Sequence, residues 1–158
     1  MHTKLTSVVI AIWLAGLAGT ADAVAQTDHV AVVVSEKNPV ANLTKPELRR
    51  IFAGEKRSWA GGRPIRLFVR EPGTHERAVL LKLLGMSESE YKQYWAAQVF
   101  RGEAQAEPVA LFSNGMQKEA LTTFPGAIAL VNFQDVKPGM KMVKVDGHSP
   151  AEREYPLR

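Results

Sequence analysis

The segment from residue 70 to residue 75 carries the residue types best suited to chemistry in this sequence. Arg70 ends a short apolar run, and Gly73, Thr74 and His75 follow it at the start of an expected helix. An arginine guanidinium binds a tetrahedral oxyanion through two parallel hydrogen bonds. The free amides at a helix start offer further donors, with the positive end of the helix dipole behind them. The pattern therefore predicts an anion-binding site made by Arg70, Gly73, Thr74 and His75.

The same residues also fit a purely structural interpretation. A threonine that precedes a helix commonly caps it, because its hydroxyl accepts a hydrogen bond from a backbone amide of the first turn. An arginine close to Glu71 and Glu76 commonly forms a surface ion pair. Spacing alone does not decide between the anion-binding site and this alternative.

The motifs of the common catalytic and metal-binding classes do not occur in the sequence. His29, His75 and His148 form no pair at i, i+4 spacing, so they match no HExxH zinc motif. Ser113 lies outside a G-x-S-x-G frame, and no glycine-rich loop of the nucleotide-binding kind is present. We therefore expect a protein that is not an enzyme and that has no catalytic residue, metal site or cofactor.

The elements that would position Arg70 alternate between strands and capped helices. Apolar or alternating runs predict strands over residues 29–35, 64–70, 127–131 and 140–145. Capping residues predict helices that start after Thr44, Thr74, Ser87 and Ser113. We expect an α/β fold, with a mixed, mostly parallel sheet flanked by helices. The polar tail after Gly147 is expected to be loose.

The amino-terminal residues have the pattern of a secretory signal peptide. Lys4 is followed by the apolar run Val8–Gly19, which is shorter than the ~20 residues needed to cross a bilayer, and small residues up to Ala25 offer a cleavage site. We therefore predict a signal peptide over residues 1–25, a single domain over residues 26–158, and export to a periplasm. The sequence has no cysteine, which excludes a disulfide framework and a lipid-modified cysteine anchor.

The charge balance limits the partners of the protein. The 158 residues include 20 Lys and Arg against 16 Asp and Glu, which gives a net charge of +4. The positive residues are scattered rather than clustered, so nucleic acid is not an expected partner. No apolar run after the signal peptide is long enough to embed the protein in a membrane. A weak preference for small anions remains.

Several short motifs follow one another along the chain in a distinctive order. They are Leu48–Gly54 (LRRIFAG), Trp59–Ile65 (WAGGRPI), Arg70 with Gly73 and Thr74, Tyr94–Gly102 (YWAAQVFRG) and Pro125–Leu130 (PGAIAL). This order resembles the second lobe of PstS-like phosphate ABC transporter substrate-binding proteins, over nearly all of residues 26–158. The resemblance implies a lobe of the periplasmic-binding-protein type 2 superfamily, in a short single-lobe form.

The resemblance also implies a ligand site and shows where this sequence departs from the family. Arg70, Gly73 and Thr74 fall on family positions that hold phosphate. Pro72 stands where the family has a serine that contributes a hydroxyl and an amide, and proline contributes neither. Leu130 stands where the family has a tyrosine, which changes the wall of the cleft.

These observations lead to a functional hypothesis and leave an alternative open. The hypothesis is an exported protein that binds phosphate or a related oxyanion, alone or as a homodimer whose second subunit replaces the other lobe. An ABC permease would then be a further partner. The alternative is a ligand-free accessory protein that keeps the fold and contacts a membrane sensor or transporter. Arg70, Gly73 and Thr74 favour the hypothesis, whereas Pro72 favours the alternative.

Overall fold

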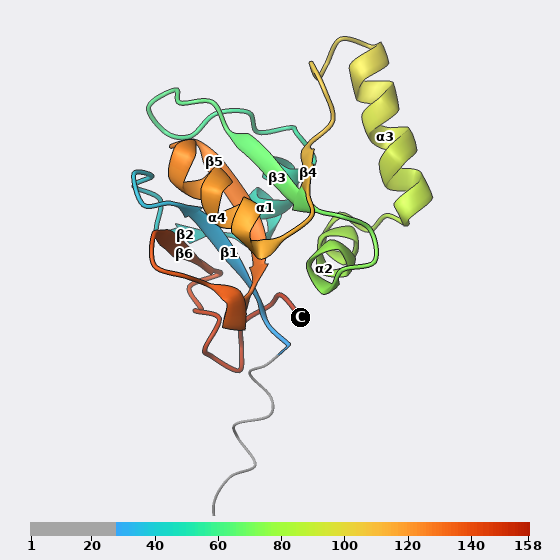
Figure 1. Cartoon of the computed structure of the whole chain (residues 1–158). Coiled ribbons are helices and arrows are strands. Elements are labelled where there is room, and N and C mark those ends of the chain that lie inside the picture. Colours follow the sequence, from blue (N-terminus) through green and yellow to red (C-terminus); the bar gives the residue numbers. More distant parts are fainter. Residues whose placement is uncertain (1–27) are drawn as a thin grey trace, which may run out of the picture.

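The computed structural model describes residues 28–158, and the predicted signal peptide over residues 1–25 lies outside them. The described residues form one six-stranded sheet with the strand order β2-β6-β1-β5-β3-β4 (Figure 1). In chain order the strands are β1 (Val30–Ser35), β2 (Asn42–Leu43), β3 (Arg66–Arg70), β4 (Val109–Leu111), β5 (Ala127–Asn132) and β6 (Met140–Val145). The helices are α1 (Lys45–Phe52), α2 (His75–Leu84), α3 (Glu88–Phe100), α4 (Asn114–Thr123) and the short 3-10 helix η1 (Phe133–Asp135).

All strands of this sheet except β1 run in the same direction. β3 pairs in parallel with β4 and β5, and β2 pairs in parallel with β6. β1 lies between β5 and β6 and is antiparallel to both. The sheet is therefore mixed and mostly parallel, which confirms the predicted fold class. This topology brings the carboxyl ends of β3, β4 and β5 to the same end of the sheet.

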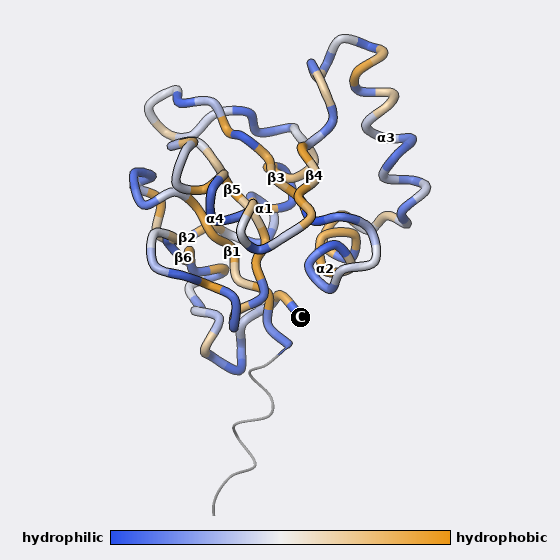
Figure 2. The backbone as a smooth tube through the Cα atoms, in the orientation of Figure 1, coloured by the Kyte–Doolittle hydropathy of each residue, from blue (hydrophilic) through white to orange (hydrophobic). Residues whose placement is uncertain are grey.

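The sheet separates two hydrophobic cores. On one face, Val32 of β1 packs in a cluster with Leu48 of α1 and Leu80 of α2. On the other face, Val33 packs in a cluster with Leu121 of α4. Every residue of β1 is buried, as its β-branched run predicts. The hydrophobic colour in Figure 2 accordingly concentrates on the strands in the middle of the molecule.

Local sequence signals explain where the helices begin. The side chains of Thr44 and Ser87 each accept a hydrogen bond from the backbone amide three positions later, and the carboxylates of Glu47 and Glu90 accept one from the backbone amide of the capping residue. Ser113 caps α4 through its hydroxyl. Because these signals involve neighbours in sequence only, the starts of α1, α3 and α4 are confirmed as predicted.

The chain after β6 is tied to the sheet, so the expectation of a loose tail after Gly147 is wrong. Tyr155 and Leu157 are buried in this tail. The Tyr155 hydroxyl donates to the Val30 carbonyl at 3.0 Å and accepts from the Val32 amide at 3.2 Å. The Val30 amide donates to the Leu157 carbonyl at 3.2 Å. β6 pairs with β1 only from Val32 onward, and the tail lies beside the residues of β1 that come before this pairing.

α3 stands beside the sheet, beyond the edge strand β4 (Figure 1). Tyr91 and Trp95 are its buried residues, whereas Phe100 at its last position is 92% exposed. The aromatic residues Tyr91 and Trp95 of this helix therefore belong to the core, whereas Phe100 at its end does not. No helix among residues 28–158 combines the length and the apolar character needed to cross a membrane.

Candidate functional site

Arg70 is the last residue of β3 and lies in a largely buried position. Its side chain is only 11% exposed. Nη1 donates a hydrogen bond to Oδ1 of Asn114 at 3.2 Å, and Nη2 lies 3.9 Å from a carboxylate oxygen of Glu71. Nε is buried and has no hydrogen-bond partner among the described residues. Arg70 thus forms the ion pair with Glu71 that the structural interpretation expects, but in a largely buried position, and its Nε is left without a partner among the described residues.

The loop after β3 leads into α2 as the sequence predicts. Gly73 has φ +89°, a conformation that glycine adopts readily, and the space around its α-carbon is open. The Thr74 hydroxyl accepts from the Arg77 amide at 3.3 Å and donates to the Glu71 carbonyl at 2.9 Å. This hydroxyl therefore serves as the helix cap, and the amides of His75 and Glu76 remain as the donors that α2 offers to a ligand.

The His75 side chain lies apart from this arrangement. Its Nε2 is 2.9 Å from the carbonyl oxygen of Asp28, in the chain that leads into β1. The imidazole therefore links α2 to the start of the sheet. Of the predicted ligand-binding residues, Arg70, Gly73 and Thr74 lie together at the β3–α2 junction, and His75 contributes its backbone amide there.

A second helix begins next to Arg70, which the sequence analysis did not include in the site. β4 pairs with β3 at Arg70 and Leu111, so α4 starts at the same end of the sheet as α2. Ser113 caps α4 by accepting from the Met116 amide at 3.1 Å, and Asn114 holds Arg70. The only signal in the sequence is the serine that caps this helix, because the pairing of β4 with β3 is a long-range contact.

Arg77 and Glu76, in the first turn of α2, belong to the packing around the site. Arg77 binds Glu88 through two hydrogen bonds, of 3.0 and 2.7 Å, and its guanidinium lies 4.0 Å from the ring centre of Tyr91. These contacts join α2 to α3 and lower the pKa of the Glu88 carboxyl, chiefly through the Arg77 hydrogen bond. Glu76 is 3% exposed, and one of its carboxylate oxygens has no partner within the described part of the chain.

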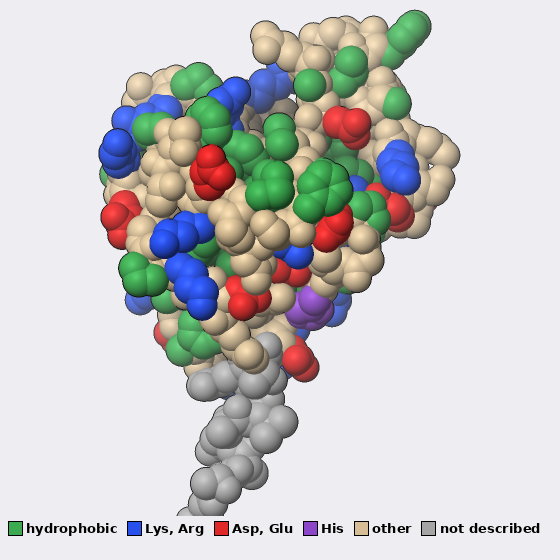
Figure 3. Space-filling model, in the orientation of Figure 1, with side chains coloured by type: hydrophobic (Ala, Val, Ile, Leu, Met, Phe, Trp, Pro, Cys, Tyr) green, Lys and Arg blue, Asp and Glu red, His purple; other side chains and the backbone are tan. Residues whose placement is uncertain are grey.

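Apolar side chains surround the start of α4 on the molecular surface. Phe112 is 64% exposed and Met116 is 39% exposed. Figure 3 shows hydrophobic side chains gathered over the junction of β4 and α4. The candidate site therefore combines the Arg70 guanidinium with the backbone amides at the starts of α2 and α4. The exposed apolar side chains of Phe112 and Met116 lie beside it.

Comparison with known proteins identifies the family. Residues 19–155 match the family model described as a PBP superfamily domain. The chain belongs to the PBP superfamily. This finding, with the sheet and helices described above, confirms the predicted periplasmic-binding-protein fold.

Solved structures of an ABC-type phosphate transport receptor and of PstS share this fold. An ABC-type phosphate transport receptor from Vibrio cholerae matches with a TM-score of 0.62 and 22% identity, over 77% of this chain and 48% of that protein. PstS from Borrelia burgdorferi matches with a TM-score of 0.59 and 18% identity, over 84% of this chain and 56% of PstS. The chain thus spans about half the length of these PBP-fold proteins.

Proposed function

We propose that this PBP-superfamily chain is a PstS-like solute-binding protein, and that it binds phosphate or a related tetrahedral oxyanion at Arg70. The observation that carries the proposal is the state of the Arg70 guanidinium. It is buried, held in place by Asn114, and left with an unsatisfied Nε donor. The site lies where ligands bind in α/β sheets, at the carboxyl ends of parallel strands.

The donor set matches a tetrahedral oxyanion in charge and in geometry. Arg70 offers charge-assisted hydrogen bonds, which are stronger than neutral ones. The starts of α2 and α4 add backbone amides at the positive ends of two helix dipoles. Gly73 leaves room for close approach of a ligand to the α2 start. The carboxylate of Glu71 near Arg70 reduces the positive potential, so we expect weak rather than tight binding.

Export to the periplasm and a role beside an ABC permease belong to the same proposal. The Vibrio cholerae neighbour is described as an ABC-type phosphate transport receptor. The predicted signal peptide over residues 1–25 would deliver the domain to the compartment in which such receptors work. In this proposal the protein binds and releases its anion without chemical change, so it needs no catalytic residue.

A thermal-shift panel on the mature chain tests this function. Phosphate, arsenate and sulfate, compared with chloride at equal ionic strength, show which tetrahedral oxyanion is bound, and at least one of them should raise the melting temperature of the wild-type protein by a few degrees. Arg70→Ala should abolish the shift, because it removes the guanidinium group that binds the anion. Arg50→Ala is the control, because it removes the same charge from the exposed surface of α1 and should leave the shift unchanged.

The same panel can overturn the proposal. An equal shift in wild type and Arg70→Ala would show that anions act through general screening. Absence of any oxyanion effect would favour the ligand-free accessory protein. Submicromolar phosphate affinity of the monomer in isothermal titration would contradict the expectation of weak binding.

A further inference from the structure

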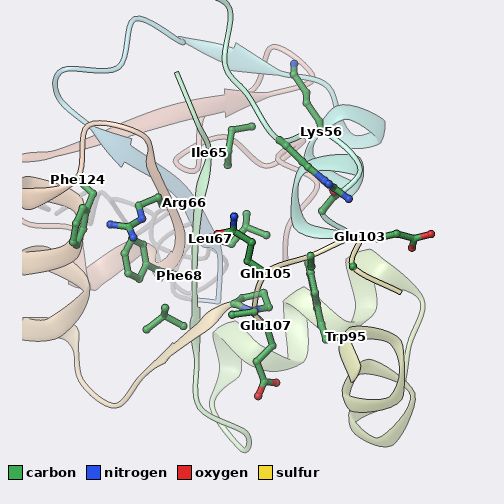
Figure 4. Close-up of a pocket in the computed structure, with 17 residues that line it drawn as sticks. Lys56, Ile65, Arg66, Leu67, Phe68, Trp95, Glu103, Gln105, Glu107 and Phe124 are labelled. Atoms are coloured by element: carbon green, nitrogen blue, oxygen red, sulfur yellow. The ribbon is translucent and has the colours of Figure 1, made fainter. Parts of the chain in front are cut away.

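A cavity of about 710 Å³ lies at the amino-terminal end of β3, whereas Arg70 is at the other end of that strand. Residues 65–68, at the start of β3, form one wall. Trp95 of α3 forms another, and the loop at residues 102–108 forms a third (Figure 4). The volume falls within the range of ligand-binding clefts, ~300–1,000 Å³. The proposed anion site uses none of these residues, so a ligand in this cavity would occupy a separate site.

Much of the backbone around this cavity is already paired. The Ile65 amide donates to the Arg57 carbonyl at 2.9 Å, and the Arg66 amide donates to the Gly126 carbonyl at 2.9 Å. In the loop, the amides of residues 102–104 donate back to the last turn of α3. The recognition of a ligand here therefore depends on side chains.

Apolar side chains line the cavity and are left partly open to water. Ile65 and Leu67 pack against the same core cluster as Trp95, but both are only partly buried. Val109, at the start of β4, also lines the cavity and is 55% exposed. An apolar group that covers these side chains removes their surface from water, which favours binding.

Arg57 places a positive charge next to these apolar side chains. Its Nε donates to the Gly54 carbonyl at 3.1 Å. Gly54 lies against the Trp95 ring, since a β-carbon on Gly54 would come within 2.7 Å of the ring atom Cη2. The bond to Gly54 therefore holds the Arg57 guanidinium close to the indole. Arg57 forms no ion pair with a carboxylate of residues 28–158, so its remaining donors are available to an anionic group.

The carboxylates that line the cavity do not face its apolar side. The Glu103 carboxylate is bound by Arg101 at 3.0 Å, and this hydrogen bond lowers the pKa of Glu103, with a smaller contribution from the charge of Arg57. Figure 4 shows the Glu103 and Glu107 side chains extending away from Leu67. Arg57 therefore acts on Glu103 without a direct bond and keeps its hydrogen-bond donors.

The other two cations of the cavity are less well placed for a ligand on the apolar side. Lys56 Nζ lies 3.8 Å from a carboxylate oxygen of Glu47, which is outside the cavity. The Arg66 guanidinium lies over the Phe124 ring, 4.3 Å from its centre, and on the other side of β3 from Trp95 (Figure 4). Arg57 is therefore the cation that accompanies the apolar side chains.

We propose that this cavity binds a small carboxylic acid with an apolar body, as a second ligand independent of the anion at Arg70. The apolar body packs on Ile65, Leu67 and Trp95. The carboxylate accepts hydrogen bonds from Arg57, because a guanidinium presents parallel donors that match the two carboxylate oxygens. A neutral apolar molecule would leave Arg57 unused, and an inorganic anion would leave the apolar side chains exposed.

Nuclear magnetic resonance of the ¹⁵N-labelled mature chain tests this site. Beyond the predicted signal peptide the sequence has two tryptophans, Trp59 and Trp95, and therefore two indole signals. Trp59 lies outside the cavity, with its indole bonded to the Gly126 carbonyl. The protein is titrated with 2-naphthoate and its amide, and with octanoate and its amide, to compare aromatic and aliphatic bodies. In at least one pair the acid should move the Trp95 signal, leave the Trp59 signal in place, and bind at least tenfold more tightly than the amide.

Variants assign the carboxylate to its partner. Arg57→Gln should weaken binding of the acid at least tenfold and leave binding of the amide unchanged. Arg50→Gln is the matched control, because it removes an exposed charge of α1 outside the cavity and should leave both affinities unchanged. Phosphate at equal ionic strength should not compete with the acid.

Four results would overturn the proposal. The acid and its amide could bind equally in both pairs, or none of the four compounds could move the Trp95 signal. Arg66→Gln, rather than Arg57→Gln, could remove the preference for the acid. Competition by phosphate would assign the acid to the anion site at Arg70 instead.

Discussion

Gly126 shows how the absence of one side-chain carbon shapes this structure. A β-carbon at this position would collide with the carbonyl oxygen of Pro64. The Gly126 carbonyl in turn accepts from the Trp59 indole at 3.0 Å and from the Arg66 amide at 2.9 Å. These contacts hold the loop before β3 against the start of β5. The Pro-Gly-Ala motif of the sequence thus has a packing role, whatever ligand the protein binds.

Replacement of Gly126 by alanine should destabilise the fold. Because the collision is with backbone, relief requires the strands to move, and we expect a loss of about 2–3 kcal/mol in the free energy of unfolding. Gly115→Ala is the control, since its nearest contact would be Ser113 Oγ at 3.7 Å and it lies in a helix. That change should be neutral or stabilising by about 0.5 kcal/mol. Urea denaturation measures the free energy of unfolding of both variants. A Gly126→Ala variant as stable as the wild type would contradict the close approach of the Pro64 carbonyl to Gly126.

At the scale of elements, α2 and α3 are joined by the ion pair between Arg77 and Glu88. The Arg77 side chain is 6% exposed and the Glu88 side chain is 31% exposed. Glu88 is the first residue of α3, so this pair fixes the start of a helix whose buried residues are Tyr91 and Trp95 alone. The position of Trp95 therefore depends on this contact.

Glu88→Gln should weaken the fold by about 1–2 kcal/mol at neutral pH, because it removes a charge-assisted partner of a buried arginine. The folded-state pKa of Glu88 lies below the ordinary value of 4.5. The contribution of the pair is therefore present above pH 4.5 and is lost as the pH falls through the folded-state pKa. Urea denaturation of both proteins from pH 7 to pH 3 should show the stability gap closing toward acid.

Glu119→Gln, at an exposed position on α4, is the matched control for this experiment. It should leave stability within about 0.5 kcal/mol across the same range. A stability gap for Glu88→Gln that persists unchanged at pH 3 would show that shape, not charge, is the important property of Glu88.

The elements and the site differ in how far the sequence predicts them. The helix starts depend on residues three positions apart, such as Thr44 and Glu47, so local patterns suffice. β4 has three residues with only Leu111 buried, and neither its length nor its pattern indicates a strand. The Arg70–Asn114 bond joins residues 44 positions apart. Such contacts depend on tertiary packing, and capping signals cannot predict them.

At the scale of the whole molecule, the carboxyl-terminal tail completes the sheet. The Tyr155 hydroxyl bonds the Val30 carbonyl and the Val32 amide, and burial raises the pKa of this phenol above its ordinary value of 10.0. Its ring also lies near that of His29, with 5.7 Å between the ring centres. The two ends of the described chain thus stabilise the same strand.

Tyr155→Phe should cost about 1–3 kcal/mol, because it leaves buried backbone groups of β1 without a partner. Tyr94→Phe is the comparison, since the Tyr94 hydroxyl bonds the Ala53 carbonyl in a partly exposed position where water can replace it. Above pH 10 the unfolded phenol ionises while the folded one resists, so wild-type stability should fall there. Chemical denaturation at pH 7 and at pH 10.5 should show that the difference in stability between wild type and Tyr155→Phe becomes smaller at the higher pH. A constant difference would contradict the burial of the Tyr155 hydroxyl.

The central position of β1 also has a consequence for the time order of folding. β1 is the first strand to leave the ribosome, yet its neighbours β5 and β6 are among the last, and Val30 pairs with Asn132. The most buried strand must therefore wait, with its apolar residues unpaired, until nearly the whole chain has been made. Pairings of such long range close slowly. A nascent chain of this protein should consequently remain unfolded, and accessible to chaperones or export factors, for most of its synthesis.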